Sequence, residues 1–143
     1  MSIENEQDLE GIREAGRLVA EALAAMRTAV RSGITTQELD ALGAEPIRRA
    51  GGRSAPQVVY GFPGVSLISV NDEIVHGIPG ARRLEPGDVV KLDVTVELNG
   101  YVADAAETVI VPPVTMTAAR LRAWARGAFR PSMAAGVGGR GGG

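Results

Sequence analysis

Three side chains in the middle of the chain are of types that bind metal ions or transfer protons. Asp93 interrupts a run of β-forming residues, and Asp104 stands in a second such run, flanked by alanines. Aspartate is depleted in strands, so a carboxylate in each of two strand-like segments needs an explanation. The third is His76, the only histidine of the chain, which comes just before a Gly-Ile-Pro turn sequence. These three residues are the first candidates for a functional site.

The residues between the two aspartates predict how their side chains are placed. Asn99-Gly100 is the strongest short-range signature of a two-residue type I′ hairpin. Such a turn puts Thr95 opposite Asp104, so Asp93 and Asp104 become diagonal neighbours on one face, with Cα atoms about 7–8 Å apart. Two carboxylates that converge beside apolar surface repel each other unless they are protonated or bridged by a cation. A divalent metal ion is the simplest explanation for the pair.

A solvated polar face is the alternative explanation. Apolar and polar residues alternate over residues 90–98, as they do in any half-solvated antiparallel strand. The surroundings of Asp104, Tyr-Val-Ala-Asp-Ala-Ala, favour a site because this is not the composition of a surface strand. For His76 the alternative is a polar residue with satisfied hydrogen bonds and no catalytic role. Its neighbours Asp72 and Glu73 are expected to be surface or turn residues rather than ligands.

Two helices are expected before the hairpin. Apolar residues recur every three or four positions over residues 9–30, which predicts a helix from about Gln7 to Arg31. We expect it to pack against the sheet, the alternative being a partner-binding face. Thr35 and Glu38 have capping-box spacing and predict a second helix that ends near residue 49. Pro46 predicts a kink or an early end of that helix.

Beyond the second helix the pattern becomes that of strands. The segment VVYGFPG, which begins at Val58, predicts a loop after its first residues, and residues 66–71 predict a strand. LEPGD, with Pro-Gly at its centre, predicts a turn before the hairpin. Together these elements predict an α+β fold in which an antiparallel sheet carries helices on one face.

Composition excludes several classes of protein. The 143 residues suffice for one domain with a core, and the net charge of −2 gives no basis for binding nucleic acid or an anionic membrane. The chain has no cysteine, which excludes disulfides, thiolate metal sites and a cysteine nucleophile. No apolar run approaches the length of a membrane span, and the acidic N-terminus lacks the features of a signal peptide. We therefore expect a cytoplasmic protein.

At these residues the sequence resembles the methionine aminopeptidases of the type I-like group, metallopeptidases of the pita-bread fold. The resemblance runs from about Ile3 to Val111 and depends on FPGVSLISVNDEIVHGIPG and GDVVKLDVTVELNGYVADAAETV. A histidine before Gly-Ile-Pro, then Asp-Val-Thr-Val, then a second aspartate eleven positions after the first, occur in the family's order. The resemblance implies the N-terminal half of the pita-bread fold.

The resemblance also implies a role for each candidate residue. Asp93 and Asp104 would bind the family's two divalent metal ions (Co, Mn, Fe or Zn), with Asp104 bridging them and Thr95 beside them. His76 would hydrogen-bond the substrate near the scissile peptide bond. The pocket for the methionine side chain would be lined by Phe62 and Leu67. The implied substrate is the N-terminal methionine of nascent peptides, whose first peptide bond is attacked by a metal-bridging water.

The chain departs from the family pattern towards its C-terminus. The family site needs another histidine and two glutamates, yet no histidine follows His76 and no glutamate follows Glu107. The Gly-rich stretch SMAAGVGGRGGG is typical of a truncated or frame-shifted end, with a functional flexible tail as the alternative. We expect half of a catalytic domain over residues 1–114, the start of another helix over 115–130, and a disordered tail over 131–143.

Three functions remain open from the sequence. The first is a metal-dependent methionine aminopeptidase. The second is a catalytically incomplete half-fold that binds metal or peptide weakly. The third is a subunit completed through its uncovered sheet, by dimerisation or by a separate chain that carries the missing ligands. The sequence favours family membership over autonomous catalysis.

Overall fold

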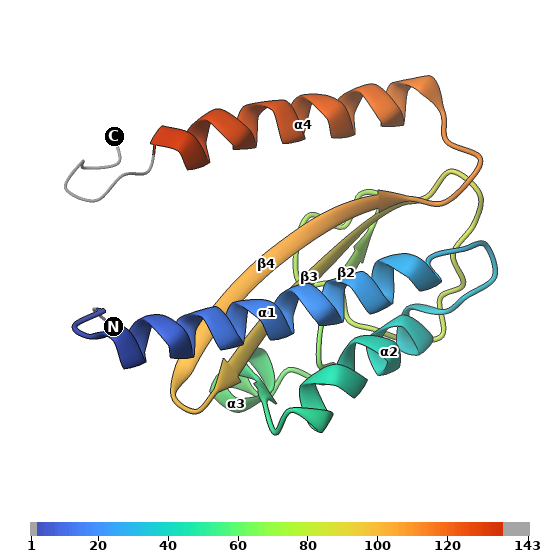
Figure 1. Cartoon of the computed structure of the whole chain (residues 1–143). Coiled ribbons are helices and arrows are strands. Elements are labelled where there is room, and N and C mark those ends of the chain that lie inside the picture. The colour runs from blue at the N-terminus through green and yellow to red at the C-terminus, as the bar shows by residue number, and fades with distance from the viewer. Residues whose placement is uncertain (1–2, 136–143) are drawn as a thin grey trace.

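Four helices and four strands follow one another in the computed structural model, which describes residues 3–135. In chain order they are α1 (Glu6–Ala29), α2 (Thr36–Arg49), β1 (Arg53–Ser54), α3 (Ala55–Tyr60), β2 (Leu67–Val70), β3 (Val89–Leu98), β4 (Tyr101–Ile110) and α4 (Met116–Ala135). Helices α1 and α2 lie on one face of the sheet, and α4 lies apart from them beyond β4 (Figure 1). The α+β expectation is confirmed. No helix in the described part of the chain is long and apolar enough to cross a membrane.

Strand β3 is the centre of the sheet. It pairs antiparallel with β4 along its whole length, and its other edge pairs antiparallel with β1 and β2. Every second side chain of β3 is buried, and the intervening ones are only partly covered. The buried ones are Val90, Leu92, Val94, Val96 and Leu98. This alternation was predicted from the sequence, and it turns one face of the sheet into the floor of the core.

Helix α1 covers that face, as its periodicity predicts. Asn5 caps the helix by accepting a hydrogen bond from the backbone N–H of Asp8 at 2.9 Å. Val19, Leu23 and Met26 are buried in the core with the apolar side of β3. The phenolic hydroxyl of Tyr101, from β4, donates to the carboxylate of Asp8 at 3.0 Å, which ties the start of α1 to the sheet.

Helix α2 begins at the predicted capping box. The backbone N–H of Glu38 donates to the Thr35 hydroxyl at 3.1 Å, and the backbone N–H of Thr35 donates to the Glu38 carboxylate at 2.8 Å. The helix ends at Arg49, near its expected end, so of the two effects expected of Pro46, a kink or an early end, the early end is wrong. Proline removes only one backbone donor here, close to the last turn, and both Pro46 and Ile47 are buried, so packing holds this turn in helical form.

Helix α3 was missed, because the segment from Val58 was expected to be strand or loop. Ser54 accepts a hydrogen bond from the backbone N–H of Gln57, Pro56 lies in the first turn, and Gly61 ends the helix with φ of +69°. These are ordinary start and stop signals for a helix. In the sequence analysis, Val58 and Val59 outweighed these helix signals, because β-branched residues are typical of strands.

Helix α4 also differs from expectation. It extends to Ala135 and so continues past Arg130-Pro131, where the disordered tail was expected to begin. The rest of that expected tail, residues 136–143, lies outside the described residues.

The core of α2 provides a stability test with an internal control. Leu39 is fully buried, whereas Leu42 of the same helix is 43% exposed. We expect Leu39→Ala to lower the free energy of unfolding by about 3 kcal/mol, since it leaves a cavity. Leu42→Ala should cost under about 1 kcal/mol. Chemical denaturation of both variants checks this, and equal losses would contradict the packing described.

The capping box should make stability depend on pH. Hydrogen bonds from the backbone N–H and then the hydroxyl of Thr35 hold the pKa of the Glu38 carboxyl below its usual value of 4.5. A carboxyl with a lowered folded-state pKa stabilises the fold above its unfolded pKa, and this contribution is lost as pH falls. Glu38→Gln should therefore melt at a lower temperature than the wild type near neutral pH. The difference should shrink as the pH is lowered below 4.5, and a constant difference would refute the linkage.

Candidate functional site

The hairpin between β3 and β4 forms with the predicted register. Asn99 and Gly100 both have positive φ, +52° and +88°, as a type I′ turn requires. Thr95 pairs with Asp104, and Asp93 pairs with Ala106. Residues paired across strands share a face, so both aspartates project from the face opposite the α1 side. The structure thus places the two predicted carboxylates together, as diagonal neighbours.

Asp104 is hydrogen-bonded to a neutral donor. The Thr95 hydroxyl donates to its Oδ1 at 2.6 Å. That bond fixes the direction of the carboxylate while Oδ2 has no described hydrogen-bond partner. Thr95 is therefore placed beside the aspartates, where the sequence predicted it, and it can orient one of them.

Asp93 is paired instead with a cation that the sequence analysis did not single out. Lys91 Nζ lies 3.1 Å from Asp93 Oδ2, and the two side chains are only 31% and 21% exposed. The sequence did indicate that Lys91 and Asp93 could meet, because residues two apart in a strand point to the same face. It was not used, since a lysine in an alternating strand is ordinary.

Leu67 lies next to this pair. It is directly opposite Asp93 in the register of β2 with β3, and it is 3% exposed. A row of side chains therefore crosses three strands, from Leu67 through Asp93 to Ala106. The apolar side chain predicted for a substrate pocket and one of the predicted metal ligands are thus cross-strand neighbours.

His76 is held beside β2 by the glycine that follows it. The Gly77 carbonyl accepts from the backbone N–H of Ile68 at 2.9 Å, and the Gly77 N–H donates to the Ser69 hydroxyl at 3.1 Å. A side chain at position 77 would put its Cβ 2.1 Å from the Ile68 carbonyl oxygen, so only glycine fits. His76 itself has φ of +60°, a left-handed conformation that is uncommon for residues other than glycine.

One aromatic ring, that of Tyr60, lies against His76. Its imidazole is stacked on Tyr60, with ring centroids 6.4 Å apart, and Tyr60 meets Phe62 edge to face at 6.2 Å. The structure thus brings His76 and Phe62 into one cluster through Tyr60. Tyr60 was missed, because it belongs to the unpredicted helix α3.

Asp40 was also missed. Its carboxylate accepts hydrogen bonds from the backbone N–H groups of Val65 and Ser66 and from the Ser66 hydroxyl, at 2.6–3.1 Å. These bonds attach the chain just before β2 to helix α2. Asp40 therefore positions Leu67 through the backbone, and no local sequence pattern indicates it.

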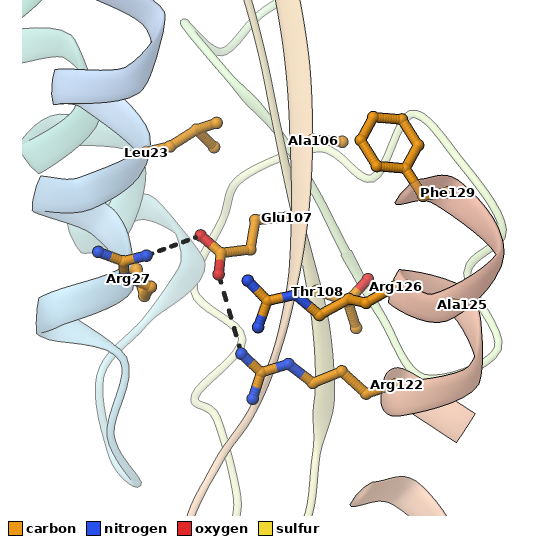
Figure 2. A pocket seen from close by; sticks show the side chains of 9 residues that line it. All are labelled: Leu23, Arg27, Ala106, Glu107, Thr108, Arg122, Ala125, Arg126 and Phe129. Carbon is orange, nitrogen blue, oxygen red and sulfur yellow. Dashed lines mark hydrogen bonds and ion pairs between the residues drawn. The ribbon is translucent and has the colours of Figure 1, made fainter. Parts of the chain in front are cut away.

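A hollow of about 570 Å³ lies elsewhere, between α1, β4 and α4. At its centre Glu107 pairs with Arg27 of α1 at 3.3 Å and with Arg122 of α4 at 3.8 Å (Figure 2). Neither aspartate of the candidate site lines it. Glu107 therefore links both helices to the edge of the sheet.

The donor set fits part of a metal site. Aspartate oxygens are suitable ligands for divalent ions, and Asp93 and Asp104 share one face of neighbouring strands. Among residues 3–135, however, no group of three or more His, Cys, Asp or Glu side chains is placed to hold a metal ion. The described residues thus offer two candidate ligands, and a metal ion bound there would need further ones.

The chain is similar to curated proteins over most of its length. The chain is 42% identical over 105 residues to methionine aminopeptidase 2 of Bacillus subtilis, an alignment that covers 73% of this chain and 42% of that relative. It is 40% identical over 119 residues to a methionine aminopeptidase of Clostridium perfringens, covering 83% and 48%. The chain therefore spans less than half the length of these curated relatives.

Solved structures and a family model agree with these relatives. The methionine aminopeptidase of Rickettsia prowazekii superposes with a TM-score of 0.85 at 33% identity, over 91% of this chain and 52% of that one. This superposition confirms that the fold matches about half of a pita-bread enzyme. The model of metallopeptidase family M24 matches residues 10–135. Since that match covers most of the chain, the protein belongs to metallopeptidase family M24.

Proposed function

We propose that this chain carries the two-aspartate part of a divalent metal site that serves the removal of N-terminal methionine from peptides. The observation that supports it most is the register of β3 with β4, which puts Asp93 and Asp104 on one face. Family membership adds that such a chain depends on divalent metal ions. The relatives that match it are named methionine aminopeptidases.

Each residue of the face has a role in this proposal. Asp93 and Asp104 bind the metal ions (Mn, Fe, Co or Zn), and Thr95 orients Asp104 through the hydroxyl bond at 2.6 Å. Bound metal ions lower the pKa of a coordinated water and stabilise negative charge that develops on a peptide carbonyl. The strands contribute precision, because neither aspartate stands on a loop.

The cluster of Tyr60, Phe62 and His76 supports the proposal that the substrate has an apolar side chain. Phe62 and Leu67 are both buried, and Leu67 lies directly opposite Asp93 in the sheet. In this proposal the two side chains would line the place of a methionine side chain. His76, stacked on Tyr60, is exposed and free to hydrogen-bond a peptide. Large apolar side chains are exposed on the same two segments, as expected of a surface that docks a peptide. They are Val58, Val59, Ile74, Val75 and Ile78.

The proposal includes a limit on catalysis by this chain alone. Hydrolysis by paired metals requires two ions held about 3.5–4 Å apart. Two aspartates leave most of each coordination sphere to water, so that spacing is not enforced. We therefore propose weak metal binding without appreciable turnover by this chain, and activity only when further ligands complete the site.

Metal binding tests the site directly. Titration of the chain with Mn²⁺ by calorimetry should show weak binding, and Asp104→Asn should weaken it by about tenfold or more, because the substitution removes a ligand charge. Asp72→Asn is the matched control, since Asp72 is an exposed carboxylate in a turn. Equal Mn²⁺ binding by the wild type and Asp104→Asn would contradict the proposed metal site.

A methionine-release assay tests the proposal that this chain alone has no appreciable turnover. With Mn²⁺, Co²⁺ or Fe²⁺ present, the chain should release no appreciable methionine from a Met-Ala-Ser peptide. Robust release that Asp104→Asn abolishes would contradict the limit, and would indicate that a dimer or a partner chain completes the site.

A further inference from the structure

Lys91 occupies the place of a cation at the proposed metal face. Its ammonium lies 3.1 Å from Asp93 Oδ2, and both side chains are mostly covered. An ion pair sheltered in this way is screened less by water than one on the open surface. The carboxylate of Asp93 is therefore already neutralised by a group belonging to the same strand.

The neighbours of Asp93 give it no other compensating group. Its partners across the strands are Leu67 and Ala106, which cannot donate hydrogen bonds from their side chains. Within the described residues, Lys91 is the only cation in ion-pair contact with Asp93. A buried or half-buried carboxylate needs a charge partner, and Lys91 meets that need here.

Lys91 in turn has no other charged neighbour across the strands. It stands between Ser69 of β2 and Thr108 of β4, both uncharged. Among residues 3–135 its one ion pair is with Asp93. The ammonium is therefore held at the site by Asp93 itself.

The two aspartates differ in how they can receive a metal ion. Asp104 accepts from the neutral Thr95 hydroxyl through Oδ1, so that bond can persist when a cation binds Oδ2. The Lys91 ammonium carries the same sign of charge as a metal ion and holds an oxygen that the ion would use. Like charges a few ångströms apart repel, so Lys91 and a metal ion cannot both occupy Asp93 Oδ2.

We propose that Lys91 is an internal competitor for the metal site: it holds Asp93 in the metal-free chain and must leave when a divalent ion binds. This inference depends on the proposed metal site. If Lys91 competes in this way, the weak affinity of the chain for divalent ions has a second cause besides the missing ligands. Removing the ammonium should tighten binding at Asp93.

The test is a Mn²⁺ titration of the full chain by calorimetry. Lys91→Met keeps the aliphatic stem and removes the charge, and it should bind Mn²⁺ about two- to fivefold more tightly, the range that ion pairs of up to about 1 kcal/mol are worth. Lys91→Gln, a second neutral variant, should shift binding in the same direction. Lys91→Arg retains the charge and should stay within about twofold of the wild type.

Two controls separate the ion pair from a general effect of charge. Arg53→Met removes a cation that pairs with Glu97 further along β3, and it should leave Mn²⁺ affinity within about twofold. In an Asp93→Asn background, Lys91→Met should no longer tighten Mn²⁺ binding, because the carboxylate with which Lys91 pairs is absent. A gain that persists in that background would overturn the inference.

The outcomes distinguish this inference from the function it depends on. Unchanged or weaker binding by both Lys91→Met and Lys91→Gln, while Asp93→Asn still weakens binding, would overturn the competitor and leave the metal site standing. If neither Asp93→Asn nor Asp104→Asn changes binding, the metal site is wrong and the competitor with it.

Discussion

The register between β3 and β4 determines what the rest of the molecule contacts. Side chains alternate between the two faces of a strand, so a shift of one residue would exchange the faces. Val94 and Val96 would then meet water, and Asp93 would enter the core under α1. An unpaired carboxylate has a far higher free energy when it is buried than when it is in contact with water. The burial that builds the core therefore also keeps the aspartates on the open face, and Asn99-Gly100 sets the register that makes both possible.

The features predictable from the sequence are those with local causes. The hairpin follows from two turn residues, and the start of α2 follows from the spacing of Thr35 and Glu38. Helix α3 could not be predicted as easily, because its caps compete with Val58 and Val59, which favour strands. No local pattern indicates the positive φ of His76, and the close contact of Gly77 with β2 is non-local. The continuation of α2 through a proline likewise depends on tertiary packing.

The candidate site consists of two parts with separate supports. The aspartates depend on the hairpin, whereas His76 and Phe62 depend on loops held against β2 and on the stacked ring of Tyr60. Strand β2 joins the parts, because Leu67 pairs with Asp93 and the next residue, Ile68, bonds to Gly77. Sequence reasoning found Asp93 and Asp104 from the hairpin and His76 as the only histidine, whereas Phe62 came only from the family resemblance. It missed Lys91 and Tyr60, whose importance comes from which neighbour each one meets.

The contact between Gly77 and β2 has a consequence for motion. The segment that carries His76 is irregular and largely exposed, which usually means independent fluctuation. Here two hydrogen bonds and a backbone approach that admits no side chain tie it to Ile68 and Ser69. We therefore expect the loop and the strand to open as one cooperative unit, so that the histidine moves on the timescale of the sheet rather than on that of a surface loop.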